Sequence, residues 1–355
     1  MRVKLKDVCE KATSKLKQSD ILSLGGKYPV FGASGYLGNM DSYHQDKPYI
    51  AVVKDGAGIG RTTILPPKSS VIGTMQYLIP KENVMPEYLY YVVKHMRLQK
   101  YYTGATIPHI YFKDYQNEEF NLADSIRQRE IVKVLKNVED TIRYQEIEIN
   151  KFDELIKARF IEMFGDPVSD TKNWGQTQLK EHLESIKYGT STPPIFTDNG
   201  YAFIRATNIK NGKIVTNDMK YIPQEEADRL EKCKLSGGEI IIVRSGVNAG
   251  DTCVVTDEYI GQYAGYDMIL VLSRDLHPVF FNTLINTEYM DKVVKPLTRR
   301  AAQPHLNSEQ TQRLPIIQVP FELQNQFADF VQQVDKSRFD IKKSIIELER
   351  EVVYD

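Results

Sequence analysis

The chain has 355 residues, 41% hydrophobic and 26% charged, which is typical of an ordinary globular protein long enough for two domains. No apolar run is long enough to span a bilayer, and the first residues (MRVKLKDVCE) lack a signal-peptide core, so we expect a cytoplasmic protein. The cysteines Cys9, Cys233 and Cys253 lie far apart and without CxxC spacing, which indicates neither a zinc site nor a disulfide framework. The net charge of −1 is unlike that of a typical nucleic-acid binder, which carries a basic surplus.

The first part of the chain is predicted to be rich in strands. Short β-branched runs bounded by Gly, Pro, Asp or Ser predict strands at YIAVV (49–53), TTILPP (62–67) and YLIP (77–80). A short helix is expected near Glu87 to Gln99. We therefore expect an α+β domain.

A long helix is predicted to follow. Its apolar residues recur at alternating steps of four and three, which places them along one side of a helix that packs against a partner helix. These positions are Ile131, Leu135, Val138, Ile142, Ile149, Phe152 and Ile156, with the polar Gln145 inside the series. The 26 residues correspond to about 40 Å of helix, at about 1.5 Å per residue.

The same order of elements then recurs. Residues 164–175 (FGDPVSDTKNWG) are polar, turn-prone and aperiodic, and indicate a domain boundary. Strands are predicted at EIIIVRS (239–245), TCVVTD (252–257) and DMILVLS (267–273), and a short helix near Pro278 to Val294. A second four-three series contains Phe327, Val331, Val334, Ile341, Ile345, Leu348 and Val352, with the polar Arg338 inside it.

Direct sequence echoes show that the chain is a duplication. VKLKDV at Val3 resembles TQLKEH at Thr177, and VVKDGAGIGRTT at Val52 resembles IVRSGVNAGDTC at Ile242. GATIPHI (104–110) resembles RAAQPHL (300–306), and the same offset carries Gln128 onto Gln324. The second copy holds extra residues before and after the glycine-rich turn. Halves of about 160 to 185 residues are too long for solenoid repeats and indicate a duplicated domain.

We therefore predict an α+β fold in which two similar globular domains alternate with two long helices that pack against each other. The predicted boundaries are 1–126 and 174–322 for the domains, 127–165 and 323–355 for the helices, and 166–173 for a linker. The alternative is that each helix lies on its own domain. Gln145 and Arg338 interrupt the two apolar series at different steps, which can fix register and orientation.

Catalytic motifs are missing from the sequence. DGAGIGRT (55–62) has three residues between Gly56 and Gly60 where a P-loop needs four, arginine instead of lysine, and a predicted strand instead of a following helix. Neither a methyl-donor loop, a nucleophile elbow nor histidines at metal-ligand spacing is found, so we predict a non-catalytic chain without a metal site. An enzyme that uses the glycine-rich loop, and a scaffold that binds proteins or glycans, remain alternatives.

Two similar domains joined by a helical rod could read two separated sites on DNA, whose major groove returns to the same face about every 34 Å. Base and phosphate contacts need basic, amide and hydroxyl side chains. Residues 139–162 carry a charge of −3, so the rest of the chain is slightly basic at +2, and a partner is expected to supply further positive surface. The candidate DNA contacts are Tyr36, Lys54, Arg61, Thr103, Thr106, His109, Arg205, Asn208, Lys210, Arg244, Ser245, Asn248, Lys295, Arg299, Arg300, Gln303 and His305.

The chain resembles the specificity subunit of type I restriction–modification systems over essentially its whole length. The resemblance rests on the domain-helix-domain-helix order, with GATIPHIYFKDYQNEEFNL before the first helix and RAAQPHLNSEQTQRLPI before the second. YPVFGASGYLGN, GYAFIRATNIKNGKI and VRSGVNAGDT are also similar to target recognition domains of that family.

The resemblance implies that the two globular domains are target recognition domains, each reading one half of a split DNA target. The same resemblance implies that the two helices pair as an antiparallel coiled coil, with pseudo-twofold symmetry, and set the gap between the halves. It also implies two methyltransferase subunits that use S-adenosylmethionine, and restriction subunits that use ATP and Mg²⁺, with no cofactor on this chain. One departure is that proline leads into the second helix (Pro320) but not the first, which leaves open how the first helix joins its domain. The Pro-His segments either serve only as a folding turn or permit close approach of DNA or a methyltransferase subunit.

Overall fold

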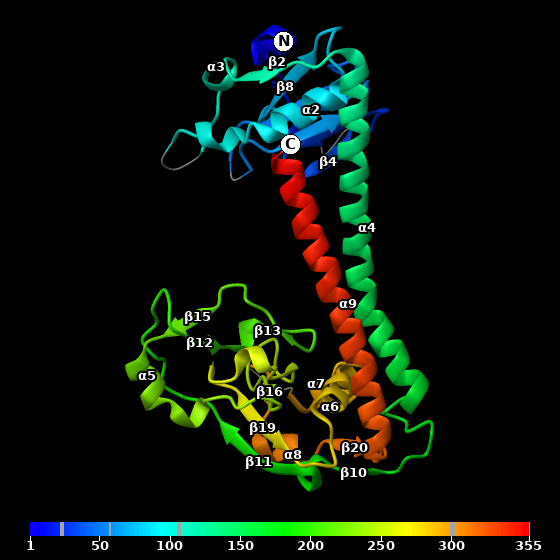
Figure 1. The fold of residues 1–355 in the computed structure, drawn as a ribbon, viewed down its shortest axis with the longest axis vertical. Helices are drawn as coiled ribbons and strands as arrows, with labels where there is room; N and C mark the ends of the chain where they lie inside the picture. Colours follow the sequence, from blue (N-terminus) through cyan, green and yellow to red (C-terminus); the bar gives the residue numbers. More distant parts are fainter. Residues whose placement is uncertain (22–24, 57, 105–107, 299–302, 355) are drawn as a thin grey trace. The chain divides into compact units, whose positions relative to one another are not determined.

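The computed structural model describes residues 1–21, 25–56, 58–104, 108–298 and 303–354. It divides into two compact units, the first made of Met1–Tyr144 with Ile345–Asp355 and the second of Gln145–Ser344. Each unit holds a globular α+β part and segments of the long helices α4 (Ser125–Phe164) and α9 (Phe321–Tyr354) (Figure 1). Among the described segments, no helix is long and apolar enough to cross a membrane.

The first unit contains a four-stranded antiparallel sheet of order β2-β8-β5-β6 and a three-stranded sheet of order β4-β3-β7, in which β3 and β7 are parallel. Strands β1 and β9 form a separate pair. The strands are β1 (Arg2–Lys4), β2 (Cys9–Thr13), β3 (Tyr28–Gly32), β4 (Gly35–Met40), β5 (Tyr49–Val53), β6 (Thr62–Leu65), β7 (Ser70–Val71), β8 (Met75–Pro80) and β9 (Glu119–Asn121). The helices of this part are α1 (Leu5–Val8), η1 (Gln18–Asp20), α2 (Pro86–His95), η2 (Leu98–Tyr101) and α3 (Phe112–Tyr115).

The second unit repeats this plan. Its main sheet has the order β11-β19-β16-β17, its smaller sheet has the order β15-β12-β18 with β12 and β18 parallel, and β10 pairs with β20. The strands are β10 (Gln176–Gln178), β11 (Leu183–Tyr188), β12 (Tyr201–Ile204), β13 (Ile209–Lys210), β14 (Lys213–Ile214), β15 (Lys220–Ile222), β16 (Ile240–Ile242), β17 (Thr252–Val254), β18 (Tyr263–Ala264), β19 (Met268–Leu272) and β20 (Pro315–Ile317). The helices are η3 (Leu179–His182), η4 (Ala206–Asn208), α5 (Gln224–Arg229), η5 (Glu231–Cys233), η6 (Asp257–Tyr259), α6 (Pro278–Ile285), η7 (Met290–Val294), α7 (Lys295–Thr298) and α8 (Ser308–Gln312).

The central strands are buried on both faces, which explains their unbroken apolar sequences. In β5, Ile50 and Val52 pack in the same core cluster as helix α2, while Ala51 and Val53 pack in the cluster that contains Val71 of the smaller sheet. Strand β16 is buried in the same way, between a cluster with helix α6 on one side and a cluster with Ala264 of β18 on the other. All six predicted strands and both short helices are present.

The second copy is longer because its smaller sheet carries an insertion. Strands β3 and β4 are joined through Ala33 and Ser34, whereas the β12–β15 connection contains η4 and the hairpin β13–β14. The expected extra residues before the glycine-rich turn are thus confirmed. They lie in this connection and in the longer β15–β16 connection, which holds α5 and η5.

Within the second unit the two long helices lie side by side and antiparallel (Figure 1). Gln145 Nε2 donates to Ser344 Oγ at 3.1 Å, Arg338 Nη2 donates to Asp153 Oδ1 at 2.6 Å, and the rings of Phe160 and Phe327 lie 5.5 Å apart. Residue numbers rise along one helix as they fall along the other. The two helices therefore pack against each other in this unit, and the alternative that each lies only on its own domain is wrong here.

Burial along both helices follows the predicted apolar series. Each predicted position whose side chain is described is buried or half-buried, including the polar Gln145 and Arg338; the side chain of Val352 lies outside the description. In the second unit these positions include Ile149, Phe152, Ile156, Val331, Val334 and Ile341. The four-three spacing therefore identifies the buried sides of both helices.

A buried glutamine joins each long helix to its globular part. The Gln128 carboxamide accepts from the backbone N–H of Met85 at 2.9 Å and donates to the carbonyl oxygens of Asn83 and Ala123. The Gln324 carboxamide accepts from His277 N–H at 2.8 Å and donates to the carbonyl oxygens of Asp275 and Val319. The first helix, despite its missing proline, is therefore attached by the same contacts as the second.

Candidate nucleic-acid interface

The glycine-rich segment of the first unit is a tight turn between two antiparallel strands, β5 and β6. Gly60 N–H donates to Val53 O at 2.8 Å, and Val53 N–H donates to Arg61 O at 2.9 Å. Gly60 has a φ of +78°, and a Cβ atom there would lie 2.5 Å from Gln99 N, so both backbone conformation and space require glycine. Because a strand follows the turn, no helix N-terminus is available to bind phosphate, and the P-loop alternative is excluded.

The second unit contains the same turn with the same hydrogen bonds. Gly250 N–H donates to Val243 O at 2.8 Å, and Val243 N–H donates to Asp251 O at 2.8 Å. Gly250 has a φ of +100°, and a Cβ there would lie 2.5 Å from Val294 Cγ1. The backbone of this turn is therefore common to both domains.

The repeated Pro-His segments pair with these turns. Gly56 N–H donates to Pro108 O at 3.0 Å and Ile110 N–H donates to Lys54 O at 2.9 Å. In the second unit, Gly246 N–H donates to Pro304 O at 3.1 Å and Leu306 N–H donates to Arg244 O at 2.8 Å. Pro108 and Ile110 in the first unit, and Pro304 and Leu306 in the second, thus anchor the glycine-rich turn. Close approach of DNA or a methyltransferase subunit to these segments stays a prediction.

The side chains at the two turns differ although the backbone is shared. In the first unit, His109 Nδ1 lies 2.7 Å from Asp55 Oδ1, and Lys54 Nζ lies 3.8 Å from the other carboxylate oxygen of Asp55. In the second unit the guanidinium Cζ of Arg244 lies 5.3 Å from the centre of the Tyr188 ring, and Ser245 takes the place of Asp55. The two turns therefore present different chemistry at equivalent positions.

Several predicted contacts of the first unit gather at or near its turn. Lys54 and Arg61 belong to the turn itself, and Thr103 N–H and His109 N–H each donate to the other's carbonyl oxygen at 2.8 Å. Arg61 is exposed and donates from Nη1 to Ala33 O at 2.9 Å. Tyr36 lies on β4 with 61% of its surface exposed. Thr106 lies outside the described residues.

The predicted contacts of the second unit lie in several places. Arg244, Ser245, Asn248, Gln303 and His305 belong to the turn or to the segment paired with it, and Ser245 and His305 form a β-bridge. Lys210 is exposed on β13, in the inserted hairpin. Arg299 and Arg300 lie outside the described residues.

Two residues of the inserted segment have structural roles that sequence reasoning missed. Asn208 is fully buried, and its amide accepts from Arg205 N–H and donates to the carbonyl oxygens of Val215 and Asn217. The expectation that Asn208 contacts DNA is therefore wrong, because its hydrogen-bonding groups are used inside the domain. Arg205 donates from Nη2 to Asp218 at 2.9 Å to the carboxylate and 2.6 Å to the carbonyl oxygen, which ties it to the same loop.

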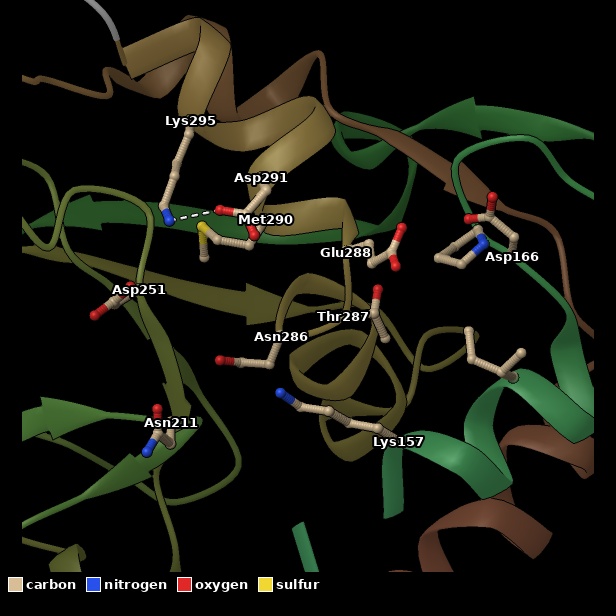
Figure 2. A pocket seen from close by; sticks show the side chains of 12 residues that line it. Lys157, Asp166, Asn211, Asp251, Asn286, Thr287, Glu288, Met290, Asp291 and Lys295 are labelled. Carbon is tan, nitrogen blue, oxygen red and sulfur yellow. Dashed lines mark hydrogen bonds and ion pairs between the residues drawn. The ribbon is translucent and has the colours of Figure 1, made fainter. Parts of the chain in front are cut away.

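Lys295 lines a pocket of about 700 Å³ in the second unit (Figure 2). Its ammonium group pairs with Asp291 at 2.6 Å. Four carboxylates (Asp166, Asp251, Glu288 and Asp291) line this pocket against the two ammonium groups of Lys157 and Lys295. The pocket is thus net acidic and does not favour phosphate.

The described residues offer few groups suited to redox or metal chemistry. Burial raises the pKa of the Cys9 and Cys253 thiols to about 12, so both remain protonated core residues. In the part of the chain that the structure describes, no group of three or more His, Cys, Asp or Glu side chains is placed to hold a metal ion.

Two stretches, residues 1–152 and 171–350, match the family model described as "Type I restriction modification DNA specificity domain". The chain belongs to this family. The two matched stretches correspond to the two copies recognised in the sequence, and DNA sequence specificity is the role of such a subunit. It is a recognition subunit and not a catalytic one, and the scaffold alternative is not favoured.

Individual members of the specificity family are distant in sequence. The chain is 22% identical over 308 residues to the type I restriction enzyme MjaVIII specificity subunit of Methanocaldococcus jannaschii, covering 81% of this chain and 72% of that protein. It is 26% identical over 188 residues to the putative MjaX specificity subunit of the same organism, covering 49% and 42% of the two chains.

Solved structures of the specificity family share the fold. The S subunit of a type I restriction–modification system from M. genitalium matches with a TM-score of 0.58 at 14% identity, over 99% of this chain and 93% of that chain. A chain from a structure that addresses complex assembly and conformational transition of the type I R-M system gives a TM-score of 0.61 at 14% identity, over 99% and 95%.

Sequence reasoning missed Asp55 and Tyr188 as neighbours of the candidate contacts. The signal for Asp55 was available, since it aligns with Ser245 in two otherwise similar turns. Tyr188 ends β11 and meets Arg244 only through the folded sheet, so no local pattern marks it.

Proposed function

We propose that this chain is the sequence-specificity subunit of a type I restriction–modification complex, in which each globular part reads one half of a split DNA target. The observation that carries this proposal is that both units share one strand order and one hydrogen-bonded turn, yet carry different side chains on it. Because the two domains share the backbone of this turn, both can approach DNA in the same way, whereas their different side chains can select different bases. Two unlike half-sites are the expected target.

The paired helices are proposed to set the gap between the half-sites. Their contacts in the second unit, from Gln145–Ser344 through Arg338–Asp153 to Phe160–Phe327, define one register. A helix pair in a defined register acts as a spacer of fixed length, because sliding by one turn would separate each of these partners.

Further subunits are proposed to supply catalysis. Two methyltransferase subunits that hold S-adenosylmethionine, and restriction subunits that hold ATP and Mg²⁺, would join this chain on DNA. Native mass spectrometry of the co-purified complex gives the stoichiometry directly; a single methyltransferase subunit per chain would contradict this part of the proposal.

Selection of random duplexes by the full chain with its methyltransferase partner tests the proposal. We expect enrichment of one asymmetric motif made of two short halves with a constant gap. Removal of one matched heptad from both α4 and α9 shortens the pair by about 10 Å, so the gap is expected to shrink by up to about three base pairs while both half-sites persist. Enrichment of no split motif, or a gap that does not respond, contradicts the proposal.

A further inference from the structure

A comparison of the two turns distinguishes residues that could read bases from residues that could not. Phosphates are the same in both half-sites, whereas the bases differ, so a side chain kept in both turns carries no information about which half is bound. The histidine of the Pro-His segment is kept, as His109 and His305. The pair that begins each turn is not, since Lys54 and Asp55 stand where the second domain has Arg244 and Ser245.

The guanidinium of Arg244 is held in place without an ion pair among the described residues. Its Cζ lies 5.3 Å from the centre of the Tyr188 ring, and Tyr188 in turn accepts a hydrogen bond from Ser308 N–H at 2.8 Å. The Asp267 carboxylate accepts from the backbone N–H of Arg244 at 3.0 Å. The Arg244 side chain therefore has its position fixed by an aromatic ring and its backbone fixed by a buried acid.

The donors of Arg244 are not consumed by this arrangement. Its Nε is buried, and within the described parts of the chain it has no hydrogen-bond partner. Stacking covers a face of the guanidinium, whereas the N–H donors lie in its plane. Nε itself is enclosed by the protein, so a base would be contacted through the two terminal amino groups of the guanidinium.

In the first domain the equivalent cation, Lys54, lies next to an acid. Lys54 lies 3.8 Å from Asp55, whose other oxygen contacts His109. A contact to phosphate would be useful in both domains, yet among the described residues the cation forms an ion pair in only one of them. In the second domain Asp267 attracts Arg244, but its carboxylate accepts from the backbone N–H and not from the guanidinium. Moreover, an ammonium is a point charge, while a guanidinium offers a fork of donors that matches the O6 and N7 acceptors of guanine.

We propose that Arg244 is a specificity-determining residue of the second domain and that it reads a guanine in the major groove through O6 and N7. This inference rests on the proposed function of the chain as a DNA-specificity subunit. Its consequence is that one half-site contains a guanine whose recognition depends on this arginine.

The test uses the full chain with its methyltransferase partner, as wild type, Arg244→Lys, Arg244→Ala and the control Arg274→Lys, an exposed arginine away from the turn. Motifs are selected from random duplexes with each protein. We expect both Arg244 variants to lose about 10-fold or more of the selectivity at one guanine and to keep the other half-site unchanged. The Arg274 variant is expected to select the wild-type motif.

A second measurement takes its main readout from the wild-type protein and uses Arg244→Ala for comparison. Replacing that guanine by 7-deazaguanine removes the N7 acceptor, and we expect about 10-fold weaker binding by the wild type and no change for Arg244→Ala. If Arg244 variants weaken all sequences alike and reduce the salt dependence, Arg244 contacts phosphate and the inference is overturned. If the wild type selects a split motif that Arg244→Lys does not alter, the inference alone fails, whereas no split motif from the wild type refutes the proposed function itself.

Discussion

The ion pair between Arg338 of α9 and Asp153 of α4 should measurably stabilise the helix pair in its observed register. The Arg338 side chain is only 10% exposed and that of Asp153 is 43% exposed, with 2.6 Å between Nη2 and Oδ1. Removing one partner of a fully buried pair costs about 3 to 5 kcal/mol. Since Asp153 still reaches water and Lys213 Nζ lies 3.5 Å from the same oxygen, we expect Arg338→Ala to cost about 2 kcal/mol.

The magnitude is best isolated by a double-mutant cycle of Arg338→Ala and Asp153→Ala. A charged hydrogen bond with one partner buried should give a coupling energy of about 1.5 kcal/mol. The control is the exposed pair Arg313–Glu309, four residues apart on α8 and its C-cap, for which about 0.3 to 0.5 kcal/mol is expected. Arg338→Met, which retains packing on the Phe152 ring, should lose less than Arg338→Ala.

Urea unfolding followed by tryptophan fluorescence reports on this unit specifically. Trp174 is the single tryptophan of the sequence, and its Nε1 donates to Phe164 O at the end of α4, against the same core. Far-UV circular dichroism follows both units together. A coupling energy for Arg338–Asp153 no larger than that of the exposed control pair would refute the reasoning, because the buried contact would then add nothing to the register.

Three further results are expected. Gly250→Ala should lower the melting temperature more than Gly261→Ala: both positions have positive φ, but only at Gly250 would the new Cβ clash, at 2.5 Å from a buried valine, adding about 1 to 3 kcal/mol; equal losses would contradict this. Gln324→Leu should cost about 3 kcal/mol through three lost hydrogen bonds and should shift the unfolding transition detected by tryptophan fluorescence. Gln128→Leu should shift only the transition detected by circular dichroism. The reverse pattern would contradict the view that each glutamine attaches its helix to its own globular part. Burial raises the pKa of Asp267. Between the ordinary and the raised pKa the folded chain therefore binds more protons than the unfolded chain, and this group's contribution to stability falls as pH rises above its ordinary pKa. Asp267→Asn should therefore be more stable relative to the wild type at about pH 7 than at about pH 4, and a difference that does not vary with pH in differential scanning calorimetry would contradict the assignment.

Local patterns in the sequence determined the elements and their pairing. The run YIAVV predicted a strand because it is a short β-branched run, and β5 is that strand, buried on both faces. The four-three series identified the buried sides of α4 and α9, because helical periodicity is a property of the chain itself. Matching the two copies found Gln128 and Gln324, although the sequence could not show that both amides bind backbone groups of their own domains.

Only the tertiary structure decided which polar side chains remain available to a ligand. Asn208 and Arg244 both follow strands in loops of similar composition, yet the first is enclosed by its own loop and the second lies on Tyr188 with a donor left over. The physical reason is that the loop conformation reached on folding commits a polar side chain through its hydrogen bonds: Asn208 bonds Arg205, Val215 and Asn217 of its own loop. The periodicity of the sequence does not indicate these hydrogen-bond partners. Composition therefore identified candidate residues, and only the folded structure showed which of them remain available.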